Sequence, residues 1–311
     1  VSMDSPLALA SSGETLVGKP QTLGANLLIL PRAYQLDPGV SGYIQTADHR
    51  FEMDSLESAL ISRLEQEHMW FRVILDSKVS INGNAPFDDS ALANEVGKML
   101  LAEATAANNA HAEAIVLDLP ALWGRVPLYE DATGENTGGI SLDQWQQMIT
   151  EIRARFAGKI YFVINYGAEG ISGLPAFSES LDGFVVQWHQ PLGNDTDAVA
   201  TVYEELQNEI VPNIPTGKYI FIDLPVPSRA GVLDGCVNGD ETACGEKQID
   251  EAGQAEYYRA LLGAIDQSDN IEGVISDGFD PSLAITDLRE SIYNKQAGNI
   301  AAGWYAAWGI K

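Results

Sequence analysis

Short apolar runs rich in β-branched and aromatic residues recur along the chain, and most precede a segment with the apolar spacing of a helix. The runs predict strands, and this alternation is typical of a parallel sheet covered by helices. The expected strands are Pro6–Ala10, Asn26–Leu30, Trp70–Leu75, Ala114–Leu119, Lys159–Ile164, Gly183–Gln187, Lys218–Leu224 and Gly273–Ser276. The clearest expected helices are Asp54–His68, Ser90–Ala107, Ser141–Phe156, Asp197–Ile210, Asp250–Asp266 and Lys295–Trp308.

This succession of βα units predicts an α/β fold, a single (β/α)8 TIM barrel over residues 1–311. An open, doubly wound sheet is the alternative, but neither a G-x-G-x-x-G fingerprint nor a P-loop follows any expected strand. The first βα unit is the weakest part of the pattern, because Ser12–Leu23 contains Gly18 and Pro20, which disfavour a helix. We therefore expect that unit to be incomplete, or its strand to lie upstream of Val1.

The chain is strongly acidic, with 18 Lys and Arg against 44 Asp and Glu and a formal net charge of −26. Such a charge repels phosphate backbones, so nucleic acid is not expected as a partner. It favours solubility or tolerance of salt, and it leaves open a structural calcium ion in acidic loops. No other cofactor is expected. No apolar run reaches the roughly 18 residues of a membrane span, so none is predicted.

The two cysteines, Cys236 and Cys244, bracket a polar loop that contains no His and no further Cys to complete a zinc site. This spacing predicts a local disulfide, with two free thiols as the alternative. A disulfide persists in oxidising compartments, so together with the acidity it predicts a secreted or cell-surface protein.

In parallel barrels the active site lies at the carboxyl ends of the strands. Polar and aromatic residues stand at or just beyond those ends here: Arg32, Tyr34, Asp76, Lys78, Asp118, Trp123, Asn165, Tyr166, Trp188, His189, Asp223, Asp277 and Phe279. They predict a carboxylate-lined cleft with aromatic walls, which suits a sugar because sugar rings stack on aromatic faces and their hydroxyls need polar partners.

Cleavage of a glycoside needs two opposed carboxyl groups, and Asp118 and Asp223 are the expected catalytic pair. The other residues of that set are expected to bind substrate, with Trp123, Tyr166 and Trp188 as sugar platforms. For any one of them a structural role is the alternative, since an Asp at a strand end often forms a turn or caps a helix.

A metal-dependent hydrolase is a further alternative, with Asp76, His189, Asp223 and Asp277 as ligands. The chain has only four His, and none shows H-x-H or H-E-x-x-H spacing, so no metal site is predicted.

Several segments, in order along the chain, resemble glycoside hydrolase family 113, the endo-β-mannanase type. They are Leu23–Pro31, the helix ending at His68 before Phe71–Leu75, the helix opening at Trp145 with Phe156–Tyr161, Pro227–Gly231, Gln254–Tyr258, Lys295–Ala297 and Trp304–Tyr305. The resemblance covers most of the chain and implies a barrel glycosidase.

By this resemblance, the acid of the fourth strand falls on Asp118 and the nucleophile of the seventh strand on Asp223, although the family has Glu at both positions. Retaining enzymes hold these carboxyl groups about 5 Å apart, and each shorter side chain widens the gap by roughly 1 Å. A wider gap admits a water molecule, which favours inversion with one Asp as acid and the other as base. The eighth strand also lacks the family's Trp, leaving Phe279 as the nearby ring.

Two functions therefore compete. The first is hydrolysis of an extracellular β-linked polysaccharide of the mannan type, with Asp118 as acid and Asp223 as nucleophile or base. The second is a catalytically inactive glycan-binding or extracellular structural module, because a protein can keep its fold after its catalytic site is lost. Carbohydrate is the expected partner, as the substrate of a hydrolase or as the ligand of a glycan-binding module. The sequence does not indicate an oligomeric state.

Overall fold

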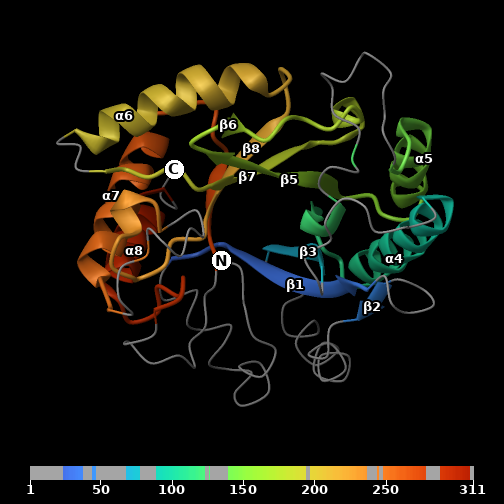
Figure 1. Ribbon diagram of the computed structural model, residues 1–311, viewed down its shortest axis with the longest axis horizontal. Coiled ribbons are helices and arrows are strands. Elements are labelled where there is room, and N and C mark those ends of the chain that lie inside the picture. Colours follow the sequence, from blue (N-terminus) through green and yellow to red (C-terminus); the bar gives the residue numbers. More distant parts are fainter. Residues whose placement is uncertain are drawn as a thin grey trace. The chain divides into compact units, whose positions relative to one another are not determined.

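A computed structural model of the protein describes residues 24–37, 44–46, 68–77, 89–122, 126, 139–193, 197–236, 244, 248–277 and 288–308 (Figure 1). The chain divides into two compact units. The first, here called the N-terminal unit, comprises Ile29–Val163 and Gly173–Gly183. The second, the C-terminal unit, comprises Ile164–Ser172, Phe184–Lys311 and the chain up to Leu28.

In the N-terminal unit, strands and helices alternate as the apolar pattern predicts. The elements are β1 (Leu27–Leu36), β2 (Ile44–Thr46), β3 (His68–Ser77), α4 (Asp89–Asn109), β4 (Ala114–Asp118), the 3-10 turn η1 (Pro120–Leu122), α5 (Leu142–Arg153), the start of β5 (Lys159–Gly167) and η2 (Ser178–Ser180). The strand order is β2-β1-β3-β4-β5. β3, β4 and β5 are parallel neighbours, and β2 runs antiparallel to β1.

The C-terminal unit continues the same alternation. Its elements are the end of β5, β6 (Gly170–Ile171), β7 (Gly183–Trp188), α6 (Ala198–Glu205), the π-helical turn η3 (Leu206–Ile210), η4 (Val211–Asn213), β8 (Tyr219–Leu224), η5 (Val232–Asp234), α7 (Glu251–Asp266), β9 (Gly273–Ser276) and α8 (Gln296–Trp308). The strand order is β5-β7-β8-β9, with β6 paired to β5 and β8 parallel to β9. α7 packs against both α6 and α8 (Figure 1).

Local sequence explains where α5 begins. Ser141 is its N-cap and accepts a hydrogen bond from the backbone N–H of Gln144, while the Gln144 side chain accepts one from the Ser141 N–H. This capping box satisfies two backbone donors that the first helical turn leaves without partners. The apolar face of α5 then carries Trp145 against Phe177, which in turn contacts Phe162 of β5.

Gly158 marks a close approach between the end of α5 and β4. A Cβ atom at this position would collide with the Phe156 ring and with the carbonyl oxygen of Glu113, which precedes β4. The same carbonyl accepts a hydrogen bond from the backbone N–H of Lys159. A glycine is therefore required where β5 begins beside β4.

The structure confirms the expected alternation of parallel strands and helices, and it corrects some boundaries. His68, expected to end a helix, is the first residue of β3. β1 runs six residues beyond the expected end at Leu30. The expected elements Pro6–Ala10, Ser12–Leu23 and residues 54–67 lie outside the described part of the chain. Closure into a single eight-stranded barrel stays a prediction.

Candidate functional site

Asp118, the first of the two expected catalytic carboxylates, closes β4 in the N-terminal unit. Arg72 pairs with Val116 and Ile74 pairs with Asp118, so Arg72 and Asp118 lie on the same face of the sheet. The Arg72 Nε donates to Asp118 Oδ2 at 2.8 Å, and Arg72 Nη2 lies 2.8 Å from the same oxygen. Both residues are buried, at 3% and 7% exposure. The site thus contains a cation that the sequence analysis did not include.

The same face also carries an aromatic pair. Trp70 of β3 and Tyr161 of β5 lie in register with Ala114 and Val116 of β4, and their ring centroids are 4.9 Å apart. This face points away from α4 and α5, because the neighbouring residues of each strand point to the side that these helices cover. Both rings are buried.

Arg32 and Tyr34, two expected substrate-binding residues, contact helix α4. Arg32 Nε donates to Glu103 Oε2 at 2.9 Å, and the Tyr34 hydroxyl donates to Glu103 Oε1. The Arg32 guanidinium also lies 5.2 Å from the centre of the Phe71 ring. All three polar residues are buried, Glu103 completely. These contacts give Arg32 and Tyr34 a role in joining β1 to α4, and their role in binding substrate stays a prediction.

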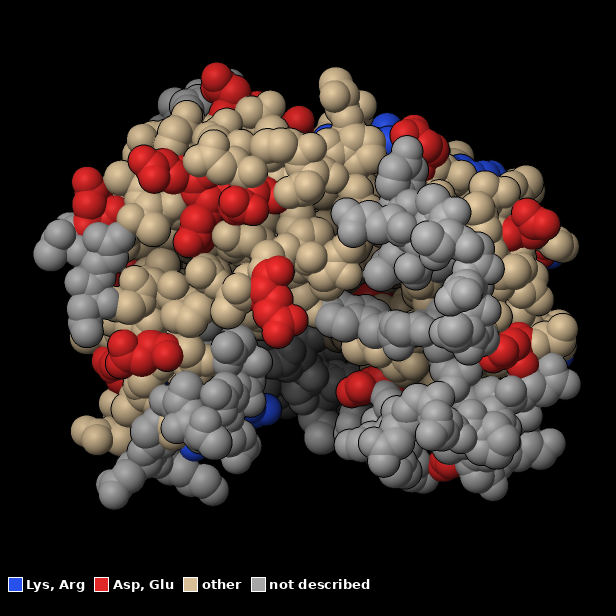
Figure 2. Space-filling model, turned by 45° about the horizontal axis from the view of Figure 1, so that its top comes forward, with Lys and Arg blue, Asp and Glu red and all other residues tan. Residues whose placement is uncertain are grey.

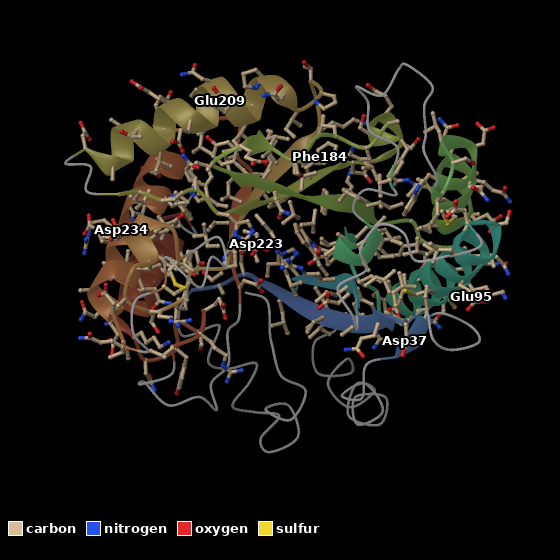
Figure 3. All side chains as sticks on the ribbon, viewed as in Figure 1. Asp37, Glu95, Phe184, Glu209, Asp223 and Asp234 are labelled. Atoms are coloured by element: carbon tan, nitrogen blue, oxygen red, sulfur yellow. A yellow bond between two sulfur atoms is a disulfide. The ribbon has the colours of Figure 1, made fainter. Side chains whose placement is uncertain are left out.

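Asp223, the second expected catalytic carboxylate, lies in β8 of the C-terminal unit (Figure 3). Its side chain is fully buried. Gln187 Nε2 of β7 donates to Asp223 Oδ2 at 3.3 Å. By strand alternation Asn165 of β5 and Asp277 after β9 project on the same face of their strands as Gln187 and Asp223. Asp223 thus lies beside a neutral amide donor that the sequence analysis did not identify.

Tyr166 and Trp188, the expected sugar platforms, lie on the opposite face of β5 and β7. Their ring centroids are 4.8 Å apart, and they are 4% and 0% exposed. Tyr166 is hydrogen-bonded to Glu205 at the end of α6, and burial, together with the nearby Glu205 and Glu209, raises the Tyr166 pKa well above its ordinary value. Sugar stacking needs an exposed ring face, so this role stays a prediction that requires the rings to become accessible.

Glu205 is half-buried and forms hydrogen bonds with the Tyr166 and Gln190 side chains. Burial raises the pKa of its carboxyl; the two hydrogen bonds partly oppose this shift, and the neighbouring Glu209 adds to it. From α7, the buried Tyr257 hydroxyl donates to the Gln190 carbonyl oxygen, and burial together with Glu205 raises the Tyr257 pKa. This polar cluster was not predicted from the sequence.

The loop after β8 is tied to the end of the chain by buried polar groups. Lys295 Nζ, 2% exposed, donates to Ser228 Oγ at 2.7 Å and to the Arg289 carbonyl oxygen at 3.3 Å. The Gln254 amide of α7 donates to the Val226 and Glu290 carbonyl oxygens. These contacts bring three segments of the GH113 resemblance together, because Gln254 of one and Lys295 of another bond the loop that includes Pro227–Gly231 and follows Asp223.

The remaining expected site residues are placed as follows. Asp76 is exposed at the end of β3. His189, directly after β7, is partly exposed, and its backbone N–H donates to the Tyr166 carbonyl oxygen at 2.7 Å. Lys78, Trp123 and Phe279 lie outside the described residues. Asp118 belongs to the N-terminal unit and Asp223 to the C-terminal unit.

Cys236 and Cys244 form a disulfide, as their spacing predicts. Acidic side chains outnumber basic ones on the described surface in view in Figure 2. Among the residues that the structure describes, which include all four members of the alternative metal set, no three His, Cys, Asp or Glu side chains group together as metal ligands would. In the same residues, no helix combines the length and the apolarity that crossing a membrane requires.

Some of the missed residues carried a signal in the sequence. Arg72 is a charge inside an apolar strand run, which marks a buried cation with a partner. Glu103 occupies the apolar stripe of α4, because Val96, Leu100 and Ala107 stand at helical spacing around it. Gln187 and Glu205 had no such signal, since their roles depend on which strand and which helix lie beside them.

Solved glycosidase structures match this arrangement of strands and helices. A family GH113 β-1,4-mannanase, solved as a complex, matches with a TM-score of 0.71 at 14% identity, covering 98% of this chain and 97% of its own. The GH113 β-mannanase AaManA from Alicyclobacillus acidocaldarius, in complex with ManMIm, matches with a TM-score of 0.68 at 16% identity over 98% and 94% of the two chains.

A family 1 β-glucosidase from Thermotoga maritima also matches, with a TM-score of 0.55 at 10% identity over 96% of this chain and 85% of that one. No protein-family profile and no curated protein sequence matches the chain. The expected resemblance to GH113 mannanases is thus confirmed at the level of the fold.

Proposed function

We propose that the chain is a glycoside hydrolase of the (β/α)8 barrel type that cleaves an extracellular β-linked polysaccharide of the mannan class. One observation carries the proposal: over nearly its whole length the fold is that of β-mannanases, and carboxylates stand at the ends of β4 and β8. In this architecture the carboxyl ends of the strands carry the chemistry.

Asp118 and Asp223 are the proposed catalytic pair, with Asp118 as acid and Asp223 as nucleophile or base. The Arg72 guanidinium at 2.8 Å favours the ionised form of Asp118. A general acid must carry a proton when it meets the leaving group. The acid role of Asp118 therefore requires that bound substrate displace Arg72 from the carboxylate.

A catalytically inactive, glycan-binding relative is the second candidate. The buried Arg72–Asp118 pair favours it, because this pair gives Asp118 a structural role that does not depend on catalysis. The shorter Asp side chains at both catalytic positions point the same way.

Hydrolysis of β-mannan and β-glucan, measured by release of reducing ends, separates the two candidates. If the enzyme proposal holds, the wild-type protein cleaves one of these, and Asp118→Asn and Asp223→Asn each lower kcat by at least about 10²-fold. Glu95→Gln, which changes a partly exposed carboxylate of α4 that pairs with Lys98 at 3.3 Å, is the control and keeps full activity. Binding without cleavage by the wild type supports the inactive relative, and neither binding nor cleavage contradicts both.

We further propose that the protein works outside the cytoplasm, supported by the Cys236–Cys244 disulfide, because such bonds persist in oxidising compartments. Thiol titration of the protein as isolated from its source cells tests this. Two titratable thiols in the folded protein would argue for a reducing compartment.

A further inference from the structure

The ends of β5 and β7 present two different sets of side chains to their two faces. Tyr166 and Trp188 face the helices, where their rings contact each other at 4.8 Å. Gln187, the residue before Trp188, faces the other way and bonds the Asp223 carboxylate at 3.3 Å. Because neighbouring residues of a strand alternate between faces, whatever fixes the Tyr166–Trp188 pair also fixes the position of Gln187.

Glu205 holds this helix-facing pair at the junction of α6 and the π-turn η3. Its carboxyl group bonds the Tyr166 hydroxyl of β5 and the Gln190 amide just after β7, so one side chain joins two strand ends. The backbone N–H of His189 adds a bond of 2.7 Å to the Tyr166 carbonyl oxygen. The Tyr257 hydroxyl holds the Gln190 carbonyl from α7. Each contact lies within the C-terminal unit.

The helix is widened at this point. The N–H of Val211 bonds the carbonyl oxygen of Leu206, a spacing of five residues instead of four. Pro212 follows, and it has no N–H and crowds the carbonyl four residues before it, which an α-helix does not tolerate. π-turns inside helices often accompany functional sites, and here the turn begins directly after Glu205.

We propose that Glu205 is a positioning residue: through Tyr166 and Gln190 it fixes the ends of β5 and β7, and thereby the Gln187 amide that bonds Asp223. The catalytic part of this inference rests on the proposed function, because Asp223 is the expected nucleophile or base. The structural part does not rest on it. Two donors from two strand ends meet on this one carboxyl group, so its removal in Glu205→Ala breaks both contacts at once.

The groups that face Glu205 are Tyr166 from β5, Tyr257 from α7 and Glu209 from η3. Since burial raises the Glu205 pKa above the ordinary 4.5, the carboxyl holds its proton more tightly in the folded than in the unfolded chain. Its contribution to stability is therefore complete below pH 4.5 and is lost as the pH rises through the folded pKa. Glu205→Gln should remove this decline in stability, because the glutamine amide does not ionise as the pH rises.

The test compares Glu205→Gln and Glu205→Ala with Glu204→Gln, which removes an exposed charge one residue earlier on α6. The Tm of Glu205→Gln relative to the wild type should rise between pH 4 and pH 7, whereas that of Glu204→Gln should not change in this way. Because the two hydrogen bonds lower the Glu205 pKa, the pH profile reports the burial of the carboxyl, and the network is tested by Glu205→Ala: a Tm equal to that of Glu205→Gln overturns it.

Positioning is read separately from stability, by NMR of the Gln187 side-chain amide, assigned by its disappearance in Gln187→Leu. Its resonances should move in Glu205→Ala, return most of the way in Glu205→Gln, and stay in place in Glu204→Gln. Unmoved resonances in Glu205→Ala overturn the positioning role even if the protein is less stable. This readout needs no turnover, so it remains decisive if the wild type cleaves nothing and the proposed function fails.

In an active wild type, Glu205→Ala should lower kcat at least about tenfold and leave KM within about twofold, because misplacement of a reacting group costs rate more than affinity. Glu205→Gln should recover most of that loss. A kcat unchanged in Glu205→Ala, or equal losses in the two variants, overturns the catalytic part.

Discussion

The two units bury their polar groups by different electrostatic means. In the N-terminal unit, Arg32 bonds Glu103 and Arg72 bonds Asp118, so buried carboxylates are held by guanidinium groups. In the C-terminal unit, Asp223 accepts from the Gln187 amide, and Glu205 bonds a phenol and an amide. Charged pairs fix one protonation state. A carboxyl group that accepts from neutral donors, as Glu205 does from Tyr166 and Gln190, can change its protonation state with pH.

The largest expected effect is the loss of a guanidinium from the N-terminal unit. Arg72→Met leaves the Asp118 charge buried without this partner, and we expect it to lower the free energy of unfolding by about 3–5 kcal/mol. Gln187→Leu, the matching change beside Asp223, removes a neutral donor and should cost less than about 2 kcal/mol. Urea unfolding followed by circular dichroism measures both. Equal losses would remove the distinction between the units.

A double variant checks the cause of that loss. The variant with both Arg72→Met and Asp118→Leu has no buried carboxylate at this position. It should recover most of the stability lost in Arg72→Met alone. A double variant no more stable than Arg72→Met would mean that lost packing, and not a buried charge, explains the effect.

A second neutral contact of the C-terminal unit, the hydrogen bond between Tyr305 and Ser276, should fail at high pH. Burial raises the pKa of Tyr305, whose hydroxyl bonds Ser276 at 2.6 Å, from 10.0 to about 12. A phenol with a raised pKa keeps its proton more tightly in the folded chain, so its stabilisation is complete below pH 10 and is lost as the pH rises towards 12. The full loss from Tyr305 amounts to about 2–3 kcal/mol.

Urea unfolding between pH 8 and pH 11, with tyrosinate absorbance at 295 nm, measures this decline. Tyr305→Phe should flatten the decline in stability above pH 10, because it removes one group that the folded chain keeps protonated. Tyrosines that all ionise at their ordinary pKa while the protein stays folded would contradict the buried contact between Tyr305 and Ser276.

The elements of this fold could be predicted because their signals are local. The cap at Ser141 and the apolar face behind it define α5, and β9 occupies the four residues expected, Gly273–Ser276. The predicted β1 is too short because the apolar run ends before Pro31 and Arg32, whereas the strand continues with buried and at least partly exposed residues in alternation as far as Leu36.

The surroundings of the candidate site could not be predicted in the same way. That Asp118 bonds Arg72 depends on the register of β3 against β4, and a shift of one residue would turn Arg72 to the helices. For the same reason, residues at strand ends were pooled as one set, although Tyr166 and Trp188 face α6 and α7 while Gln187 and Asp223 face away from them. A pattern of polar strand ends locates a site but does not say which face each side chain takes.

Tyr34 offers the smallest and most specific test of this division by faces. Its hydroxyl donates to Glu103, which also accepts from Arg32. Tyr34→Phe should therefore cost about 1.5 kcal/mol in urea unfolding, because one hydrogen bond to a charged group is lost while the ion pair remains. The affinity for mannan oligosaccharides, measured by calorimetry, should stay unchanged if Tyr34 serves only the β1–α4 contact. A weaker affinity with unchanged stability would restore Tyr34 as a substrate residue and show that strand alternation does not decide which strand-end residues reach the ligand.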